Sequence, residues 1–270
     1  MGICNVTPDS FCDGGKFFAP EVARARVDAL LEGGADIVDI GGESTRPGAK
    51  PVAAAEQIAR VLEVVRYAAG DRGACVSIDT TDAEVAAACL DAGAMVVNDV
   101  SCLRDDALAK VCAGSGAALI VMHTRGTQAE MVGFGGYPEA GYADVVREVL
   151  VEWAGAAERA VQLGVSRDSL VMDPGLGFAK SAQQSFELLR RTSQVAAAVG
   201  VPVLIGASNK SFLTTFGSGG KPTSANERLG ASIAAALHAA RAGAAIVRVH
   251  DVRATRQALD LDARLRREGS

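Results

Sequence analysis

Eight short apolar runs are spread along the chain, and polar residues follow each of them. The runs cover 1–6, 35–41, 75–80, 95–100, 118–123, 170–174, 201–208 and 245–251. Most are apolar throughout, as expected of parallel strands buried on both faces. Segments with helical periodicity lie between them, so strand and helix alternate along the whole chain. This order predicts a (β/α)8 TIM barrel, in which functional residues gather at the C-terminal ends of the strands.

The helical segments cover 20–33, 53–69, 82–92, 105–114, 141–163, 182–199, 224–242 and 252–266. Thr81 with Glu84, and Ser224 with Glu227, have the spacing of a capping box at a helix N-terminus. The 270 residues match the roughly 250 that one barrel needs. No composition shift marks a boundary, so we expect a single domain over residues 1–270.

Composition and charge narrow the class of partner. The net charge is −5 without a basic block, which argues against nucleic acid and anionic membranes as partners. No signal peptide is evident and no apolar run approaches a membrane span, so we expect a cytoplasmic protein. Six cysteines without a CxxC pair are expected to be reduced packing thiols: Cys4, Cys12, Cys75, Cys89, Cys102 and Cys112.

Three strands end in side chains that accept hydrogen bonds, namely Asp79, Asn98 and Asp173. A carboxylate at the end of an apolar strand needs a hydrogen-bond partner or a ligand. Helix capping is disfavoured for Asp79, because Thr81 fits the cap, whereas a turn with Pro174 and Gly175 stays open for Asp173. Of Asn98 and Asp99, we expect one to hold a loop and the other to face a ligand. Together these groups suit an amino-oxo pyrimidine ring rather than a metal cage.

Cationic and hydroxyl groups follow the last two strands. Lys210 suits either a Schiff base or a hydrogen bond to a ligand, with a solvated lysine as the alternative. Ser211 beside it is expected near a helical turn that accepts a small anion. Arg248 and His250 are two apart and should share one strand face, where they would bind phosphate oxygens. His123 fits a ligand contact or a satisfied core histidine equally well.

Eight segments, taken together and in order, resemble the dihydropteroate synthase family of pterin-binding enzymes. They are NVTPDSF at 5–11, DIGGESTRPGA at 39–49, SIDT at 77–80, NDVS at 98–101, MH at 122–123, DPGLGF at 173–178, SNKSF at 208–212 and RVHDV at 248–252. The resemblance implies condensation of 6-hydroxymethyl-7,8-dihydropterin pyrophosphate with p-aminobenzoate, giving 7,8-dihydropteroate and pyrophosphate for folate biosynthesis. It also implies Mg²⁺ as cofactor, a homodimer, and a target for sulfonamides, which mimic p-aminobenzoate.

The resemblance also implies roles for individual residues. The pterin ring would contact Asp79, Asn98, Met122, Asp173, Gly177, Phe178, Lys210 and Arg248. The p-aminobenzoate pocket would be formed by Thr45, Arg46, Pro47, Phe178, Lys210 and Ser211. Pyrophosphate would be held by Asn5, Arg248 and His250, with Asn5 also binding the metal. Asp79, Lys210, Arg248 and His250 would be the catalytic group.

Three features depart from the family pattern. Asn209 stands where the family usually has arginine, Cys12 stands where serine is common, and the usual extension before the first strand is absent, so we expect a barrel without it. Asn209 leaves a non-catalytic pterin-binding paralogue open as an alternative. A pterin-dependent methyltransferase and a Schiff-base aldolase using Lys210 are two further alternatives, although the first should lack the 5–11 and 44–48 loop sequences.

Overall fold

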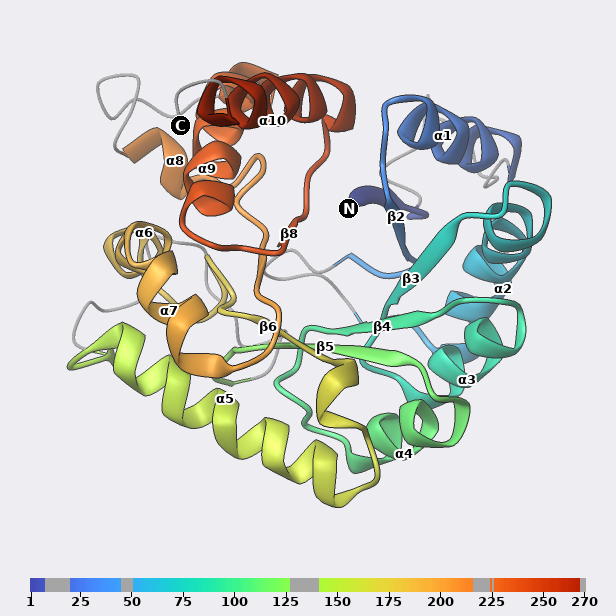
Figure 1. Cartoon of the computed structure of the whole chain (residues 1–270). Coiled ribbons are helices and arrows are strands. Elements are labelled where there is room, and N and C mark those ends of the chain that lie inside the picture. The colour runs from blue at the N-terminus through green and yellow to red at the C-terminus, as the bar shows by residue number, and fades with distance from the viewer. Residues whose placement is uncertain (8–19, 45–50, 127–140, 216–223, 225, 268–270) are drawn as a thin grey trace.

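The strands form a closed ring with the helices outside it (Figure 1). The computed structural model describes residues 1–7, 20–44, 51–126, 141–215, 224 and 226–267. Its strands are β1 (Gly2–Asn5), β2 (Ile37–Gly41), β3 (Cys75–Asp79), β4 (Val96–Asp99), β5 (Ala118–Met122), β6 (Leu170–Asp173), β7 (Leu204–Ile205) and β8 (Ile246–Val247). Each lies inside the run predicted for it, and all named pairings are parallel.

Two short contacts close the ring. The strands β1 to β6 form one continuous sheet, and β7 pairs with β8. Single bridges join Gly2 to Val249 and Met172 to Val203, so each end of the larger sheet meets the smaller one. Backbone hydrogen bonds support them, with Ile3 N donating to Val249 O at 3.0 Å and Met172 N to Pro202 O at 2.9 Å. The predicted (β/α)8 barrel is therefore confirmed.

The helices follow the predicted segments with local changes. They are α1 (Pro20–Glu32), α2 (Ala54–Arg66), α3 (Ala83–Asp91), α4 (Asp106–Ser115), α5 (Val145–Gln162), α6 (Ala182–Arg190), α7 (Thr192–Val199), α8 (Phe212–Thr215), α9 (Leu229–Arg241) and α10 (Val252–Arg267). The segment predicted as one helix over 182–199 is divided at Arg191. Among the described helices, none combines the length and apolarity that a membrane crossing requires.

The predicted cap of α3 is wrong by one residue. Asp82, not Thr81, is the N-cap, and its carboxylate accepts from Glu84 N at 2.8 Å and Val85 N at 3.3 Å. Thr80 fixes this geometry, since its hydroxyl oxygen accepts from Asp82 N. Before α9, Ser224 N donates to the Glu227 carboxylate at 2.7 Å, which forms one half of the predicted box.

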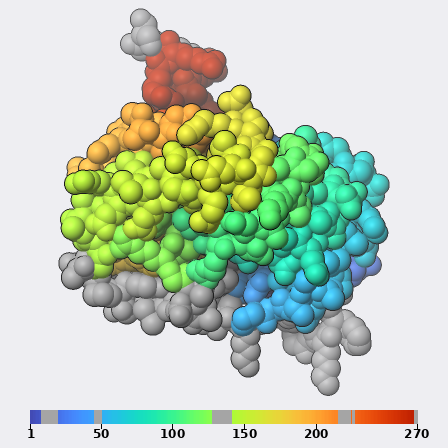
Figure 2. All heavy atoms as spheres, turned by 90° about the horizontal axis from the view of Figure 1, so that it is seen from below, coloured from blue at the N-terminus to red at the C-terminus, as the bar shows by residue number. Residues whose placement is uncertain are grey.

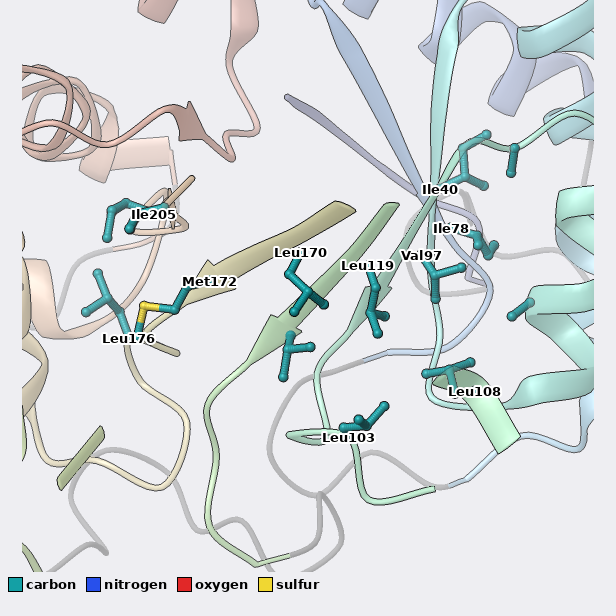
Figure 3. Packing of buried hydrophobic residues seen from close by; sticks show 14 of the residues in the cluster. Ile40, Ile78, Val97, Leu103, Leu108, Leu119, Leu170, Met172, Leu176 and Ile205 are labelled. Atoms are coloured by element: carbon teal, nitrogen blue, oxygen red, sulfur yellow. The ribbon is translucent and has the colours of Figure 1, made fainter. Parts of the chain in front are cut away.

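The apolar residues of the strands fill two separate spaces. Ile40, Ile78, Val97 and Leu119 point outward and pack in the layer between strands and helices, as the close view of the core shows (Figure 3). Their neighbours along the strands alternate to the inside. There Met1, Val96, Ile120 and Leu204 form a second cluster, which fills the interior of the barrel. The described cysteines are free thiols, as predicted.

Candidate active site

A polar layer lies toward the C-terminal ends of the strands, and Arg248 is its centre. Its Nε donates to Asp39 Oδ2 at 2.6 Å and its Nη2 donates to Asp79 Oδ2 at 2.7 Å. Asn98 Nδ2 donates to the same Asp39 oxygen at 3.3 Å. The two carboxylates are almost fully buried. One guanidinium therefore compensates two buried carboxylates, which would be costly to bury alone.

Burial controls the protonation of Asp79. It raises the pKa of this carboxyl to about 7, while the positive charge of Arg248 opposes the rise and Asp39 adds to it. Asp79 therefore changes charge near neutral pH. Groups of this kind, in a pocket and beside a fixed cation, are typical of functional sites.

Several buried acceptors in this layer have no hydrogen-bond partner among the described residues. They are Asp39 Oδ1, Asp79 Oδ1, Asn98 Oδ1 and Ser77 Oγ. Leaving a buried polar atom unsatisfied costs about 1–3 kcal/mol. Four such atoms close together indicate a place for a ligand that donates several hydrogen bonds. The neighbouring Asp99 serves the loop instead, since it accepts from Ser101 N at 2.9 Å and Ser101 Oγ at 2.6 Å. Of the expected division between Asn98 and Asp99, the loop role is confirmed for Asp99, and the ligand contact of Asn98 stays a prediction.

The opposite side of the layer is formed by residues that follow β6, β7 and β8. A Cβ built at Gly206 would lie 4.0 Å from both Asp173 Oδ2 and Lys210 Nζ, and 3.9 Å from Arg248 Cβ. Burial raises the pKa of Asp173, and the charge of Lys210 opposes it. Burial also lowers the pKa of Lys210 to about 8, with Asp173 opposing. Asp173 Oδ1 accepts from Gly175 N at 2.8 Å, so the turn interaction left open for Asp173 forms with one oxygen only.

Lys210 joins this layer to the loop after β6. Its Nζ donates to Leu176 O and lies 4.9 Å from the centre of the Phe178 ring. An ammonium at this distance from an aromatic face is attracted to it. Gly177 belongs to the same loop, with φ of 80° and its N–H bonded to Ser185 Oγ. Met122, 2 % exposed, ends β5.

The structure thus brings together most residues predicted for the pterin. Asn5 ends β1, and Ser211 directly precedes the short helix α8, as predicted. Thr45, Arg46, Pro47 and Cys12 lie outside the described residues, so their predicted roles stay predictions.

His250 lies beyond the regular part of β8, and its Nδ1 is 3.0 Å from Ser208 Oγ. It also borders a groove of about 490 Å³ beside α1 and the start of α10. Gly206 lies beside Arg248, and Ser208 lies beside His250 two residues further along both segments, which agrees with the prediction that Arg248 and His250 share one face. The contact with pyrophosphate predicted for His250 stays a prediction.

Two buried residues were not predicted as part of the site. Asp39 is fully buried and accepts a hydrogen bond from Arg248. The one signal in the sequence for this role is a charged residue inside an apolar strand, two residues before Gly41. Lys180 is also fully buried and lies behind the loop after β6, with its Nζ 3.0 Å from His123 Nδ1. His123 is thus a satisfied buried histidine, one of its two predicted alternatives.

Known proteins match this chain in sequence and fold over nearly its whole length. The family model described as "Pterin binding enzyme" matches residues 1–250. The chain belongs to this family. The dihydropteroate synthase of Mycobacterium leprae is 44 % identical over 96 % of this chain and 90 % of its own length. In Haloferax volcanii, a probable bifunctional folylpolyglutamate synthase/dihydropteroate synthase is 44 % identical over 93 % of this chain, which spans 29 % of that longer protein.

The chain is also similar in fold to a solved structure over nearly its whole length. The Xanthomonas albilineans dihydropteroate synthase with 4-aminobenzoic acid has a TM-score of 0.88 and 38 % identity, over 98 % of this chain and 92 % of that one. The same enzyme has been solved in complex with 7,8-dihydropteroate. These relatives favour the synthase over the methyltransferase, aldolase and non-catalytic alternatives.

Proposed function

We infer that this chain condenses 6-hydroxymethyl-7,8-dihydropterin pyrophosphate with p-aminobenzoate to give 7,8-dihydropteroate and pyrophosphate. The observation that carries this inference is the group of buried acceptors beside Arg248 that have no partner among the described residues. An amino-oxo pterin ring presents several N–H donors, which would satisfy these acceptors. The named relatives, dihydropteroate synthases, support the same reaction for folate biosynthesis.

The pterin would lie in the polar layer. Asp79, Asn98 and Asp173 would accept from its N–H groups, and Lys210 would donate to it. Arg248 would stack on the ring and give part of its hydrogen bonding to the ligand. Asp39 would keep this guanidinium in place, since it is its second carboxylate partner. Met122, Gly177 and Phe178 would line the apolar edge.

p-Aminobenzoate would bind near Phe178, Lys210 and Ser211, with the loop residues Thr45, Arg46 and Pro47. Its carboxylate would be held at the N–H groups that begin α8, where an anion is favoured. The amine nitrogen would attack the exocyclic carbon of the pterin. The carbon–oxygen bond to pyrophosphate breaks, the electron pair leaves with pyrophosphate, and the amine loses one proton.

Catalysis of this kind depends on positioning and on neutralising the leaving group. Asn5, Arg248 and His250 would hold the pyrophosphate. Mg²⁺ prefers oxygen ligands and often keeps waters while binding one or two protein groups and phosphates. Asn5 offers one amide oxygen, and the described residues contain no cluster of three acidic, His or Cys ligands. This donor set fits Mg²⁺ that is bound mainly through pyrophosphate, where it would neutralise the departing charge.

We further propose that the chain acts as one cytoplasmic domain over residues 1–270 and forms a homodimer. The C-terminal end of α10 projects beyond the remaining described surface (Figure 2). Leu261 and Leu265, one helical turn apart on it, are 60 % and 62 % exposed. Sedimentation velocity over a range of concentrations tests the dimer, and a monomer at every concentration would contradict it.

The decisive experiment is pyrophosphate release, measured with both substrates and again without p-aminobenzoate. We expect release only with both, and mass spectrometry should identify 7,8-dihydropteroate. Pterin binding without release would instead support a non-catalytic pterin-binding protein.

A further inference from the structure

Lys180 is a buried lysine that the proposed chemistry does not use, and burial lowers the pKa of its ammonium group to about 7. Its side chain is fully buried, and its Nζ lies 2.9 Å from Phe178 O, 3.1 Å from Gly175 O and 3.2 Å from His123 O. A fourth contact, of 3.0 Å, joins it to His123 Nδ1. An ammonium group has three donors, and all of them are directed at backbone carbonyls or at this ring nitrogen.

These contacts fix the loop between β6 and Lys180 at both ends. Gly175, with φ of 68°, lies so close to β5 that a Cβ on it would be 2.0 Å from His123 O. Lys180 therefore bonds the loop to the end of β5 at a place where no side chain fits between them. The other face of the same loop presents Leu176 O and the Phe178 ring to Lys210. Two lysines thus hold one loop, Lys180 from behind and Lys210 from the site.

A neutral histidine connects Lys180 to a carboxylate nearer the surface. His123 Nε2 lies 2.9 Å from Glu152 Oε2, and its Nδ1 faces Lys180. A hydrogen on Nε2 satisfies both contacts, because Nε2 then donates to the carboxylate and Nδ1 accepts from the ammonium. Burial, with help from Lys180, lowers the pKa of His123 to about 3. The ring therefore stays neutral and orients the two charged groups around it.

We propose that Lys180 is a positioning residue for the substrate pocket. With His123 and Glu152, it fixes the Gly175–Phe178 loop and so determines where Lys210 meets the pterin and p-aminobenzoate. This inference rests on the proposed function. A displacement of about 1 Å at a reacting site lowers catalytic efficiency by about 100-fold. A shift of the loop that holds Lys210 should therefore lower the rate of the reaction.

The first test is Lys180→Met, which keeps most of the length of the unbranched side chain and removes its amino group. The matched control is Lys110→Met, at an exposed lysine of α4. We expect Lys180→Met to lower kcat/KM for the pterin pyrophosphate by about 10- to 100-fold, and Lys110→Met to leave it unchanged. A double-mutant cycle with Lys210→Met separates positioning from general damage. If Lys180 acts through Lys210, its loss should have little further effect once Lys210 is gone.

The second test keeps Lys180 and covers the case in which Lys180→Met fails to fold. Glu152→Gln removes the negative charge next to His123, and Glu148→Gln is its control. Both glutamates pair with Arg125, but of the two only Glu152 bonds to His123. We expect a rise in the KM for the pterin pyrophosphate with Glu152→Gln and none with Glu148→Gln.

The outcomes separate the two inferences. A wild-type chain that releases no pyrophosphate contradicts the proposed function. An active wild type overturns the role of Lys180 if Lys180→Met matches Lys110→Met, if its loss adds fully to that of Lys210→Met, or if Glu152→Gln matches Glu148→Gln.

Discussion

The interior of the barrel has two layers that differ in chemistry although the same strands build both. In one layer the apolar side chains of Met1, Val96, Ile120 and Leu204 pack together. In the other, two residues further along several strands, Asp39 and Asn98 are equally enclosed and Arg248 is largely so, and hydrogen bonds hold all three. The apolar layer gains free energy by excluding water. The polar layer keeps acceptors that no group in the described part of the chain satisfies, at a cost in stability. The difference indicates that one end of the barrel serves stability and the other serves binding.

The largest expected effect is on stability, from a change in the apolar layer. Ile120→Ala should lower the free energy of unfolding by about 2–5 kcal/mol, because it removes buried methyl groups and leaves a cavity. The affinity for the pterin should stay within a factor of two of wild type while the protein is folded. Urea unfolding and calorimetric titration measure the two quantities. Val151→Ala, at a 65 % exposed residue of α5, is the control. A large loss of affinity in Ile120→Ala would show that the layers are not independent.

The next effect is on binding, from a change in the polar layer. Asp173→Asn should weaken pterin binding by roughly 1.5–3 kcal/mol, or about 10- to 150-fold, because it removes a charged acceptor. The fold should remain intact. Asp168→Asn is the matched control, since Asp168 is exposed and lies just before the N-terminal end of β6, the strand that Asp173 ends. Calorimetry with the pterin substrate measures the loss, and an affinity equal to that of the control would remove Asp173 from the site.

Protonation of the polar layer should change binding near neutral pH. Burial raises the pKa of Asp79 to about 7, well above the usual range of an aspartate carboxyl. A protonated carboxyl accepts fewer hydrogen bonds, so pterin affinity should fall as pH decreases from 8 to 6, by about tenfold for each unit below the pKa. The folded chain binds this proton more tightly than the unfolded chain. The contribution of Asp79 to stability is therefore fully present below pH of about 4 and is lost as pH rises toward 7.

Calorimetric titrations with the pterin at several pH values test the predicted fall in affinity, with Asp79→Asn as control. That variant should bind more weakly and lose most of the pH dependence. If Asp79→Asn keeps the pH dependence of wild type, a group other than Asp79 causes the change in affinity.

The smallest expected effect lies at the rim. Asn209 has φ of 60°, its N–H donates to Ser232 Oγ, and its carbonyl accepts from Arg228. Asn209→Arg should change the KM for p-aminobenzoate by up to about fivefold, the range of an exposed ion pair, and change the KM for the pterin less. Steady-state kinetics, with the concentration of each substrate varied in turn, measure the two KM values. A change confined to the pterin would contradict the proposed p-aminobenzoate pocket.

The sequence predicted the strands well because burial on both faces demands continuous apolar runs, and their polar ends were visible as exceptions. It predicted the helices less fully. The break at Arg191 lies inside a segment without Pro or Gly, where Thr192 Oγ1 bonds to Leu189 O at 2.8 Å. This is a local arrangement that apolar periodicity does not reveal.

By itself, the sequence determined the barrel, the order of its elements and the strand-end positions of Asp79, Asn98, Asp173 and Lys210, which the structure brings into one polar layer. These depend on periodicity and on position at a strand end, which are local properties. Only the tertiary structure decided that Arg248 pairs with Asp39, that His250 faces Ser208, and that Lys180 holds the loop after β6. Asp39 and Arg248 are 209 residues apart, and no local pattern encodes which of many buried charges will meet. Closure of the ring brings them together, and the cost of burying an unpaired charge then determines the pairing.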